Sequence, residues 1–326
     1  MLEELLFLSE APAPSGMEGA RARKILEFAA SLGMEGRADK LGSVIIRKNG
    51  GGRRMLLAAP LDEPCAVCCT ADDKGFLRLK AIGVSKPELY NGRQVTFAGG
   101  VTGVIGLTRA KDGTPADLWC DIGAPDKEKA LALCPPGAAG TFVHPAPKLR
   151  GGRIEGGGLS ALAGAALLLR LIKTIENQPG DLFLVFHAQK HMGHRGLQTA
   201  AFCCEADTAV LLDAVPAGDT PDAKGGVAVD SVAVKLSEGV VSYDGELSAH
   251  FLERAGIAGV KASPYLSPDA PAGADAAQLA GRGCRVCSLA LPVRFFGAAC
   301  EVACLSAFES ALALLRDFLH SAPAGT

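Results

Sequence analysis

The sequence of 326 residues has few aromatic side chains, no long apolar run and no large excess of charge. Phe, Trp and Tyr make up 5% of the chain, and the formal net charge is −2. A nearly neutral chain lacks the basic surface that nucleic acids and anionic membranes attract. The longest apolar candidate, residues 159–172, contains Arg170 and is shorter than the roughly 18 residues that a membrane span needs. We therefore expect neither a nucleic-acid partner nor a membrane span.

The first residues also lack the features of a secretory leader. Residues 1–7 are acidic and amphipathic, without the basic start and small-residue cleavage site of a signal peptide. The 11 cysteines, an odd number, are spread over the whole chain instead of framing a small domain. In a reducing compartment such cysteines are mostly buried thiols. We expect a cytoplasmic location.

Two Cys-x-x-Cys spacings, Cys65/Cys68 and Cys284/Cys287, raise the question of a structural zinc site. Both lie in stretches that have the composition of strands. Cysteine fills small core positions in such strands. We therefore interpret the four residues as core packing, with a zinc site as the alternative.

Apolar residues make up 48% of the chain, and they follow both helical and strand periods. Helical spacing occurs at residues 2–8, 19–31, 159–175, 196–202, 245–255 and 302–318. Strand-like stretches occur at 43–47, 55–59, 182–186, 209–213, 227–236 and 286–291. This alternation predicts an α/β fold with a mixed sheet covered by helices on both faces.

Between residues 65 and 152 the pattern changes to short strands separated by glycine turns, with one short helical stretch at 127–133. The change predicts a small β-rich domain inserted into the α/β fold. We place the insert at residues 65–152 and the α/β domain at residues 1–64 plus 153–326.

Six short motifs follow one another in a fixed order over about 290 residues. They lie at residues 8–16, 39–43, 72–77, 212–221, 273–276 and 291–295. Together they resemble the motifs of the M42 family of metallo-aminopeptidases, which includes glutamyl and tetrahedral aminopeptidases. The resemblance implies a zinc-peptidase or phosphorylase/hydrolase-like sheet domain with an inserted dimerisation module. It also implies a homo-oligomer, either a dimer or a dodecamer.

The resemblance implies a site for two metal ions with five protein ligands, and three of the five positions hold no ligand here. Pro60 stands where the family has histidine, Ser160 replaces the bridging aspartate, and Gly297 replaces the last histidine. His191 replaces a glutamate ligand, and Asp213 alone is unchanged. Two metals in such a site polarise the scissile carbonyl and activate a bridging water. The sequence leaves open whether Asp275 or Glu301 supplies a compensating carboxylate.

The catalytic position of the general-base glutamate holds Lys190. A protonated lysine can neither ligate a dication nor take a proton from water. The family's orienting acid is retained as Asp62, with Glu63 beside it. We expect Lys190 to form an ion pair with Asp62 and Asp213 in place of the metals.

Four further residues are predicted to line the ligand-binding cleft that the family resemblance implies: Glu63, Ser160, Asp275 and Arg294. Ser160, at the start of a predicted helix, is interpreted as its N-cap, since no Gly-x-Ser-x-Gly motif surrounds it as expected for a nucleophile. Arg294 is equally compatible with a ligand carboxylate and with an internal ion pair.

Three functions remain open. The first is a catalytically silent homologue without a cofactor, which binds peptides or small molecules or assembles with an active paralogue. The second is a working hydrolase with one zinc or cobalt ion on His191 and Asp213, which requires His187 or His194 as a further ligand. The third is a purely structural subunit of an oligomer.

Overall fold

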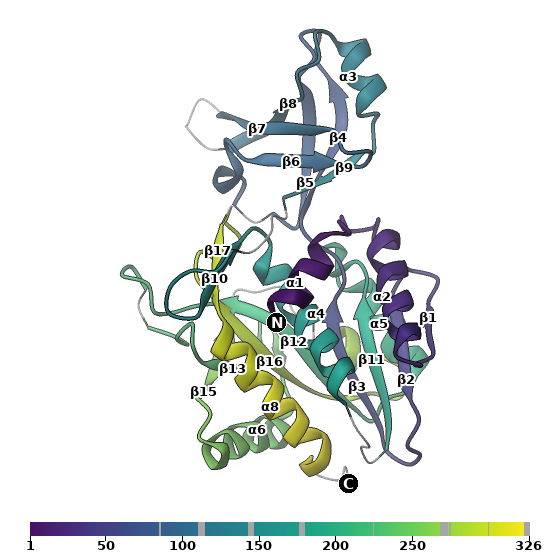
Figure 1. The fold of residues 1–326 in the computed structure, drawn as a ribbon, viewed down its shortest axis with the longest axis vertical. Helices are drawn as coiled ribbons and strands as arrows, with labels where there is room; N and C mark the ends of the chain where they lie inside the picture. Colours follow the sequence, from purple (N-terminus) through teal and green to yellow (C-terminus); the bar gives the residue numbers. More distant parts are fainter. Residues whose placement is uncertain are drawn as a thin grey trace.

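A computed structural model describes residues 1–84, 86–109, 115–142, 147–175, 180–223, 225–267, 273, 275–298 and 300–322. In these residues the chain forms a large mixed sheet, a small two-stranded sheet and a closed barrel. Figure 1 shows the barrel standing apart from the helix-covered sheet. No helix in these residues is long and apolar enough to cross a membrane.

The large sheet has the strand order β1-β2-β11-β3-β12-β16-β13-β14, and β15 pairs with β13. Its central strands β11, β3, β12 and β16 are parallel, while β2 runs antiparallel to β11 and β13 runs antiparallel to β16 and parallel to β15. The bounds are β1 Gly36–Ala38, β2 Val44–Lys48, β3 Arg54–Pro60, β11 Asp181–His187, β12 Thr208–Pro216, β13 Val232–Glu238, β14 Val241–Ser242, β15 Ala262–Ser267 and β16 Arg285–Val293. The predicted mixed α/β sheet is confirmed.

Helices cover both faces of the sheet because the apolar side chains of the strands alternate between two cores. In β3, Leu57 belongs to the larger core with α1, α2, α4, α6 and α8, whereas Leu56 belongs to the smaller core with α5 and α7. The bounds are α1 Leu2–Ser9, α2 Gly19–Ser31, α4 Leu159–Thr174, α5 Arg195–Cys204, α6 Gly245–Ala258, α7 Asp275–Gln278 and α8 Leu305–Ser321.

The barrel is formed by the chain that leaves the sheet after β3. Its strands close in the order β4-β5-β8-β7-β6-β9 around a core of their own. The elements are β4 Cys65–Ala71, β5 Leu77–Ile82, η1 Pro87–Tyr90, β6 Gln94–Phe97, β7 Thr102–Arg109, β8 Pro115–Asp121, α3 Lys127–Leu133 and β9 Ala139–Thr141. Closure of the barrel removes the exposed strand edges that a small open sheet would have.

The predicted cysteine strands are present, but the prediction for the last helix starts too early. Cys65 and Cys68 lie in β4, and Cys287 lies in β16. Residues Glu301–Cys304 form the strand β17 before α8 begins at Leu305. β17 pairs with β10 (Arg153–Gly156), so this tertiary pairing overrides a sequence that reads equally well as helix.

Candidate functional site

The candidate site lies where the parallel strands of the sheet end. The chain leaves β11 at His187 and makes one short 3₁₀ turn, η2 (Lys190–Met192). Asp62 follows the neighbouring strand β3, and Asp213 lies within the next strand, β12. Because the carboxyl ends of parallel strands share one edge of the sheet, these residues come together in space.

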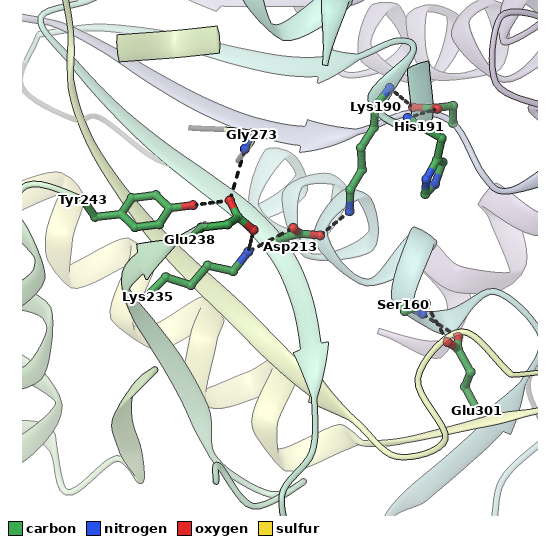
Figure 2. Close-up of polar contacts among 10 residues, drawn as sticks. Ser160, Lys190, His191, Asp213, Lys235, Glu238, Tyr243, Gly273 and Glu301 are labelled. Atoms are coloured by element: carbon green, nitrogen blue, oxygen red, sulfur yellow. Dashed lines mark hydrogen bonds and ion pairs between the residues drawn. The ribbon is translucent and has the colours of Figure 1, made fainter. Parts of the chain in front are cut away.

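Two lysine ammonium groups occupy both oxygens of the Asp213 carboxylate. Lys190 Nζ lies 2.6 Å from Asp213 Oδ1, and Lys235 Nζ lies 3.3 Å from Oδ2. Figure 2 shows the two lysines approaching the carboxylate from opposite sides. Burial raises the pKa of Asp213, but the two positive charges outweigh this effect and hold the pKa below its usual range. Asp213 is therefore a carboxylate with its charge already neutralised.

Lys235 extends this ion pair into a buried network that the sequence interpretation missed. Its ammonium group also lies 2.8 Å from Glu238 Oε1, and Tyr243 donates a hydrogen bond of 2.9 Å to Glu238 Oε2. The Lys235 side chain is only 3% exposed. A lysine inside an apolar strand needs a carboxylate partner. The position of Lys235 in such a strand could therefore have indicated a buried ion pair from the sequence.

Asp62 serves the backbone of the η2 turn and not the Lys190 ammonium group, which corrects half of the predicted ion pair. Its carboxylate accepts the backbone N–H of Lys190 at 2.8 Å and of His191 at 3.1 Å. Asp62 is fully buried. The turn is entered through Gln189, whose φ of 57° is unusual for a residue with a side chain. The retained acid thus fixes the backbone that carries Lys190.

Three glycines from distant loops make room for the bulky side chains of this turn. A Cβ atom at Gly83, in the loop after β5, would lie 2.5 Å from the His191 ring. A Cβ atom at Gly273 would lie 2.5 Å from the His194 ring, and one at Gly16 would lie 3.3 Å from the Met192 sulfur. The barrel and the sheet domain therefore meet at His191.

Glu301 caps the helix that carries Ser160, so the prediction that Ser160 is the N-cap is wrong. The N-cap of α4 is Gly158, with a φ of 73°. Glu301 Oε2 accepts the Ser160 N–H at 2.8 Å, and Oε1 accepts both the Ser160 hydroxyl and the Gly297 N–H at 2.6 Å. Figure 2 shows this pair apart from the Asp213 network. Glu301 thus joins the two positions where the family resemblance places a bridging aspartate and a histidine.

Two of the predicted cleft residues form ion pairs with other residues of the protein. Glu63 is fully buried and pairs with Arg21, so it does not line a cleft. Arg294 makes two hydrogen bonds to Asp219, of 2.9 and 2.8 Å, which is the ion pair of the two alternatives left open. Asp275 begins α7, but its side chain lies outside the described part of the chain.

Comparison with known proteins identifies the family. The family model described as M42 glutamyl aminopeptidase matches residues 42–314, which is most of the chain. This protein belongs to the M42 family. The predicted resemblance is confirmed at this level.

Individual M42 relatives agree with this assignment. A candidate aminopeptidase of Acetivibrio thermocellus is 33% identical over 213 residues, which are 64% of this chain and 64% of that protein. FrvX, a candidate aminopeptidase of Escherichia coli (strain K12), is 26% identical over 98% of this chain and 94% of its own. The TET1 peptidase of Pyrococcus horikoshii, which can assemble into a tetrahedron or a large octahedral shell, superposes with a TM-score of 0.84 at 25% identity, covering 98% and 99% of the two chains.

The donor atoms present do not fit the pair of metal ions that the M42 resemblance implies. Asp213 already binds two ammonium groups, and Glu301 is bound to Ser160 and Gly297. Burial and the Lys190 charge lower the pKa of His191 to about 4, so its ring is neutral at pH 7 and could act as one ligand, but a single histidine does not hold two metal ions. In the described residues, no three His, Cys, Asp or Glu side chains lie close enough to hold a metal ion.

The space beside these residues is small. A cavity of about 20 Å³ lies between Pro60, His187, Lys190, His194 and Asp213. A volume of this size holds about one water molecule. The Lys190 side chain and the rings of His187 and His194 line this cavity.

Proposed function

We propose that this protein is an M42 family member that does not hydrolyse peptides by the two-metal mechanism and that acts as a subunit of an assembly of its own copies. The observation that carries the proposal is the double ion pair of Asp213 with Lys190 and Lys235. A metal ion and these ammonium groups compete for the same two oxygens. Binding of a dication would leave Lys190 without its partner and Lys235 with Glu238 alone, at a cost of several kcal/mol.

The loss of hydrolysis follows from the missing electrophile and the missing base. Without a metal ion, water keeps a pKa of about 15.7 and is a poor nucleophile at neutral pH. Lys190 donates its ammonium protons to Asp213 and has no lone pair with which to take a proton from water. The carboxylates of Asp62 and Glu301 are both engaged by backbone N–H groups, so neither is free to replace the general base.

The proposal favours assembly over peptide binding because the site is filled. A cavity of about 20 Å³ has no room for a peptide end. The TET1 peptidase, which shares the fold over nearly the whole chain, can assemble into closed shells. Assembly needs the fold and its surface, and neither depends on the missing ligands. Cytoplasmic location and co-assembly with an active paralogue stay predictions.

One observation favours the second candidate, a hydrolase with a single zinc or cobalt ion. His191 Nε2 is buried and has no hydrogen-bond partner, so its lone pair is available to a metal. Such an ion would also need Asp213, which would have to give up its contact with Lys190. We therefore rank this function second.

The experiment that separates the two is the metal content of the chain together with its activity. Protein purified without a chelator or a metal-affinity tag is analysed by elemental mass spectrometry for zinc, cobalt and manganese. Amino-acid p-nitroanilides are then assayed with each metal added. We expect substoichiometric metal and no hydrolysis above the blank.

The control variants are His191→Ala and Asp213→Asn. One metal per chain that is lost in both variants, or hydrolysis that is lost in both, would overturn the proposal and establish the single-metal hydrolase.

A further inference from the structure

A second hollow, of about 550 Å³, shares no lining residue with the small cavity of the candidate site. It is lined by residues 37–41 (the end of β1 and the loop after it), by the helix α5 and by the turn that follows α7. We call it the α5–α7 groove. A hollow of this volume has room for a small organic molecule.

Apolar side chains form much of the wall of this groove. They include Leu41, Phe202 and Leu279. Phe202 is 63% exposed and Leu279 is 76% exposed. The Phe202 ring lies 4.0 Å from the position that a Cβ atom at Gly281 would take, so the ring stands beside the turn after α7. An apolar ligand in the groove would remove this wall surface from water, which is favourable.

Hydrogen bonds of Asp39 hold two walls of the groove together. Its Oδ1 accepts the backbone N–H groups of Leu41 and Ser43, each at 2.9 Å. Its Oδ2 accepts the hydroxyl group of Thr199, on α5, also at 2.9 Å. The segment that carries Leu41 is therefore fastened to α5. A pocket whose walls are already in place loses less free energy to ordering when a ligand binds.

Two cationic side chains line the groove without an acidic partner. Arg37 and Lys40 are both exposed. Among the residues that the structure describes, neither side chain forms an ion pair or a hydrogen bond. Asp39 is the one carboxylate among the described lining residues, and both of its oxygens are engaged by other donors. Two positive charges beside an apolar wall complement a ligand that is apolar and carries a negative charge.

We propose that the α5–α7 groove binds a small organic carboxylate with an apolar body. The apolar body contacts Phe202 and Leu279, and the carboxylate faces Arg37 and Lys40. These contacts need neither a metal ion nor peptidase chemistry. The inference therefore goes beyond the proposed function and does not depend on it.

The test compares three ligands that share one apolar chain and differ in the charge of the head group. Octanoate is the probe, octanol is its neutral counterpart, and octylamine is the cationic one. Isothermal titration calorimetry with the full chain should show one octanoate per chain, bound about ten-fold more tightly than octanol, and no binding of octylamine. The preference for octanoate should shrink as the salt concentration rises, because exposed charges are screened.

Two variants separate the two parts of the groove. Arg37→Ala/Lys40→Ala should bind octanoate no more tightly than octanol, whereas Phe202→Ser should weaken the binding of both ligands several-fold. Arg23→Ala/Lys74→Ala, which removes two exposed cations outside the groove, is the matched control and should bind octanoate like the wild type. All five positions are exposed, so we expect the wild-type melting temperature in each variant.

Cys203 supplies a local readout of ligand binding. Its thiol is exposed and lines the groove. Saturating octanoate should slow the iodoacetamide labelling of Cys203 several-fold, measured by mass spectrometry. The exposed Cys69, in the barrel, is the reference and should be labelled at the same rate with and without octanoate.

Three results would overturn the inference. Equal affinity of the wild type for octanoate and octanol would show that the groove does not select an anion. Unchanged octanoate binding in Arg37→Ala/Lys40→Ala would place the anion elsewhere. Absence of octanoate binding would also overturn it, and slow labelling of Cys203 in the ligand-free protein would then show that another protein surface covers the groove. None of these results bears on the metal content or on hydrolysis, which are measured separately.

Discussion

Lys235 is the residue on which the buried network depends most. It lies between Asp213 and Glu238 and is almost fully buried, whereas Lys190 reaches Asp213 from the solvent side and is 17% exposed. Burial lowers the pKa of the Lys235 ammonium group, but the two carboxylates outweigh this and raise it above its usual range. Removal of Lys235 would leave the buried Glu238 without a positive partner and Asp213 with Lys190 alone.

We predict that Lys235→Met lowers the free energy of unfolding by about 3–5 kcal/mol. Lys190→Met should lower it by a smaller amount, about 1–3 kcal/mol, because Lys235 still balances Asp213 in that variant. Urea unfolding followed by circular dichroism measures both. Lys74→Met, at an exposed position of the barrel, is the control and should change little. Equal stability of the wild type and Lys235→Met would contradict the role of the network.

Gly83 is a second residue whose role is visible only in three dimensions. It has a φ of 73°, and the His191 ring lies where its Cβ would be. Gly92 has nearly the same φ, 77°, but nothing within 4 Å of its Cβ position. The two glycines therefore share the conformational cost of substitution and differ in the steric cost.

We predict that Gly83→Ala destabilises the protein by about 1–3 kcal/mol more than Gly92→Ala does, since an added methyl in a packed site costs this much. The double variant Gly83→Ala/His191→Ala should recover most of the difference, and a double-mutant cycle measures the coupling. Equal losses of stability in the two glycine variants would show that Gly83 is not in tight steric contact with His191.

At the level of elements, the start of α4 is held by a side chain from β17. The first N–H groups of a helix have no partner within the helix, and an acidic side chain near them is favourable. Burial raises the pKa of Glu301, while its hydrogen bonds to Ser160 and Gly297 oppose this change. The capping residue is therefore 141 positions away from the helix residue it binds.

We predict that Glu301→Ala destabilises the protein by about 2–4 kcal/mol, because three partly buried donors lose their acceptor. Ser160→Ala removes only one of these donors and should cost about 1 kcal/mol. Chemical denaturation measures both, with the exposed Glu309→Ala on α8 as the control. If Ser160→Ala were as damaging as Glu301→Ala, the hydroxyl and not the carboxylate would be the cap.

For the whole molecule, the buried histidines make stability depend on pH. Burial lowers the pKa of His187 to about 3 and that of His191 to about 4, below the 6.5 of an exposed ring. The unfolded chain therefore takes up protons between pH 6.5 and 4 that the folded chain does not. Stability must fall as the pH falls through this range.

We predict a loss of about 2 kcal/mol per ring on going from pH 7.5 to pH 5.0. His191→Gln should lose less over the same interval, because one of the two rings is absent. Urea unfolding at the two pH values measures both proteins. A wild type as stable at pH 5.0 as at pH 7.5 would show that the rings are not held neutral.

Much of the fold could be predicted because each element carries its own pattern. The central strands are continuous apolar runs, and α2 and α8 show helical spacing. The start of α8 could not be predicted, because residues 301–304 become a strand only by pairing with β10. The local sequence pattern predicts an element correctly when the side chains of that element determine which face is buried. It fails when pairing with a strand far away in the sequence determines the secondary structure.

For the site, the sequence alone predicted, through the family resemblance, that Lys190, His191 and Asp213 stand in the ligand and base positions, and this assignment stays a prediction. Only the tertiary structure decided what these residues bind. Lys235 is 22 positions from Asp213 and Glu301 is 141 positions from Ser160, and the local sequence does not indicate that they complete the Asp213 ion pairs and the cap of α4. Side-chain chemistry is a property of one position, whereas an ion pair requires two positions that only the folded sheet brings together.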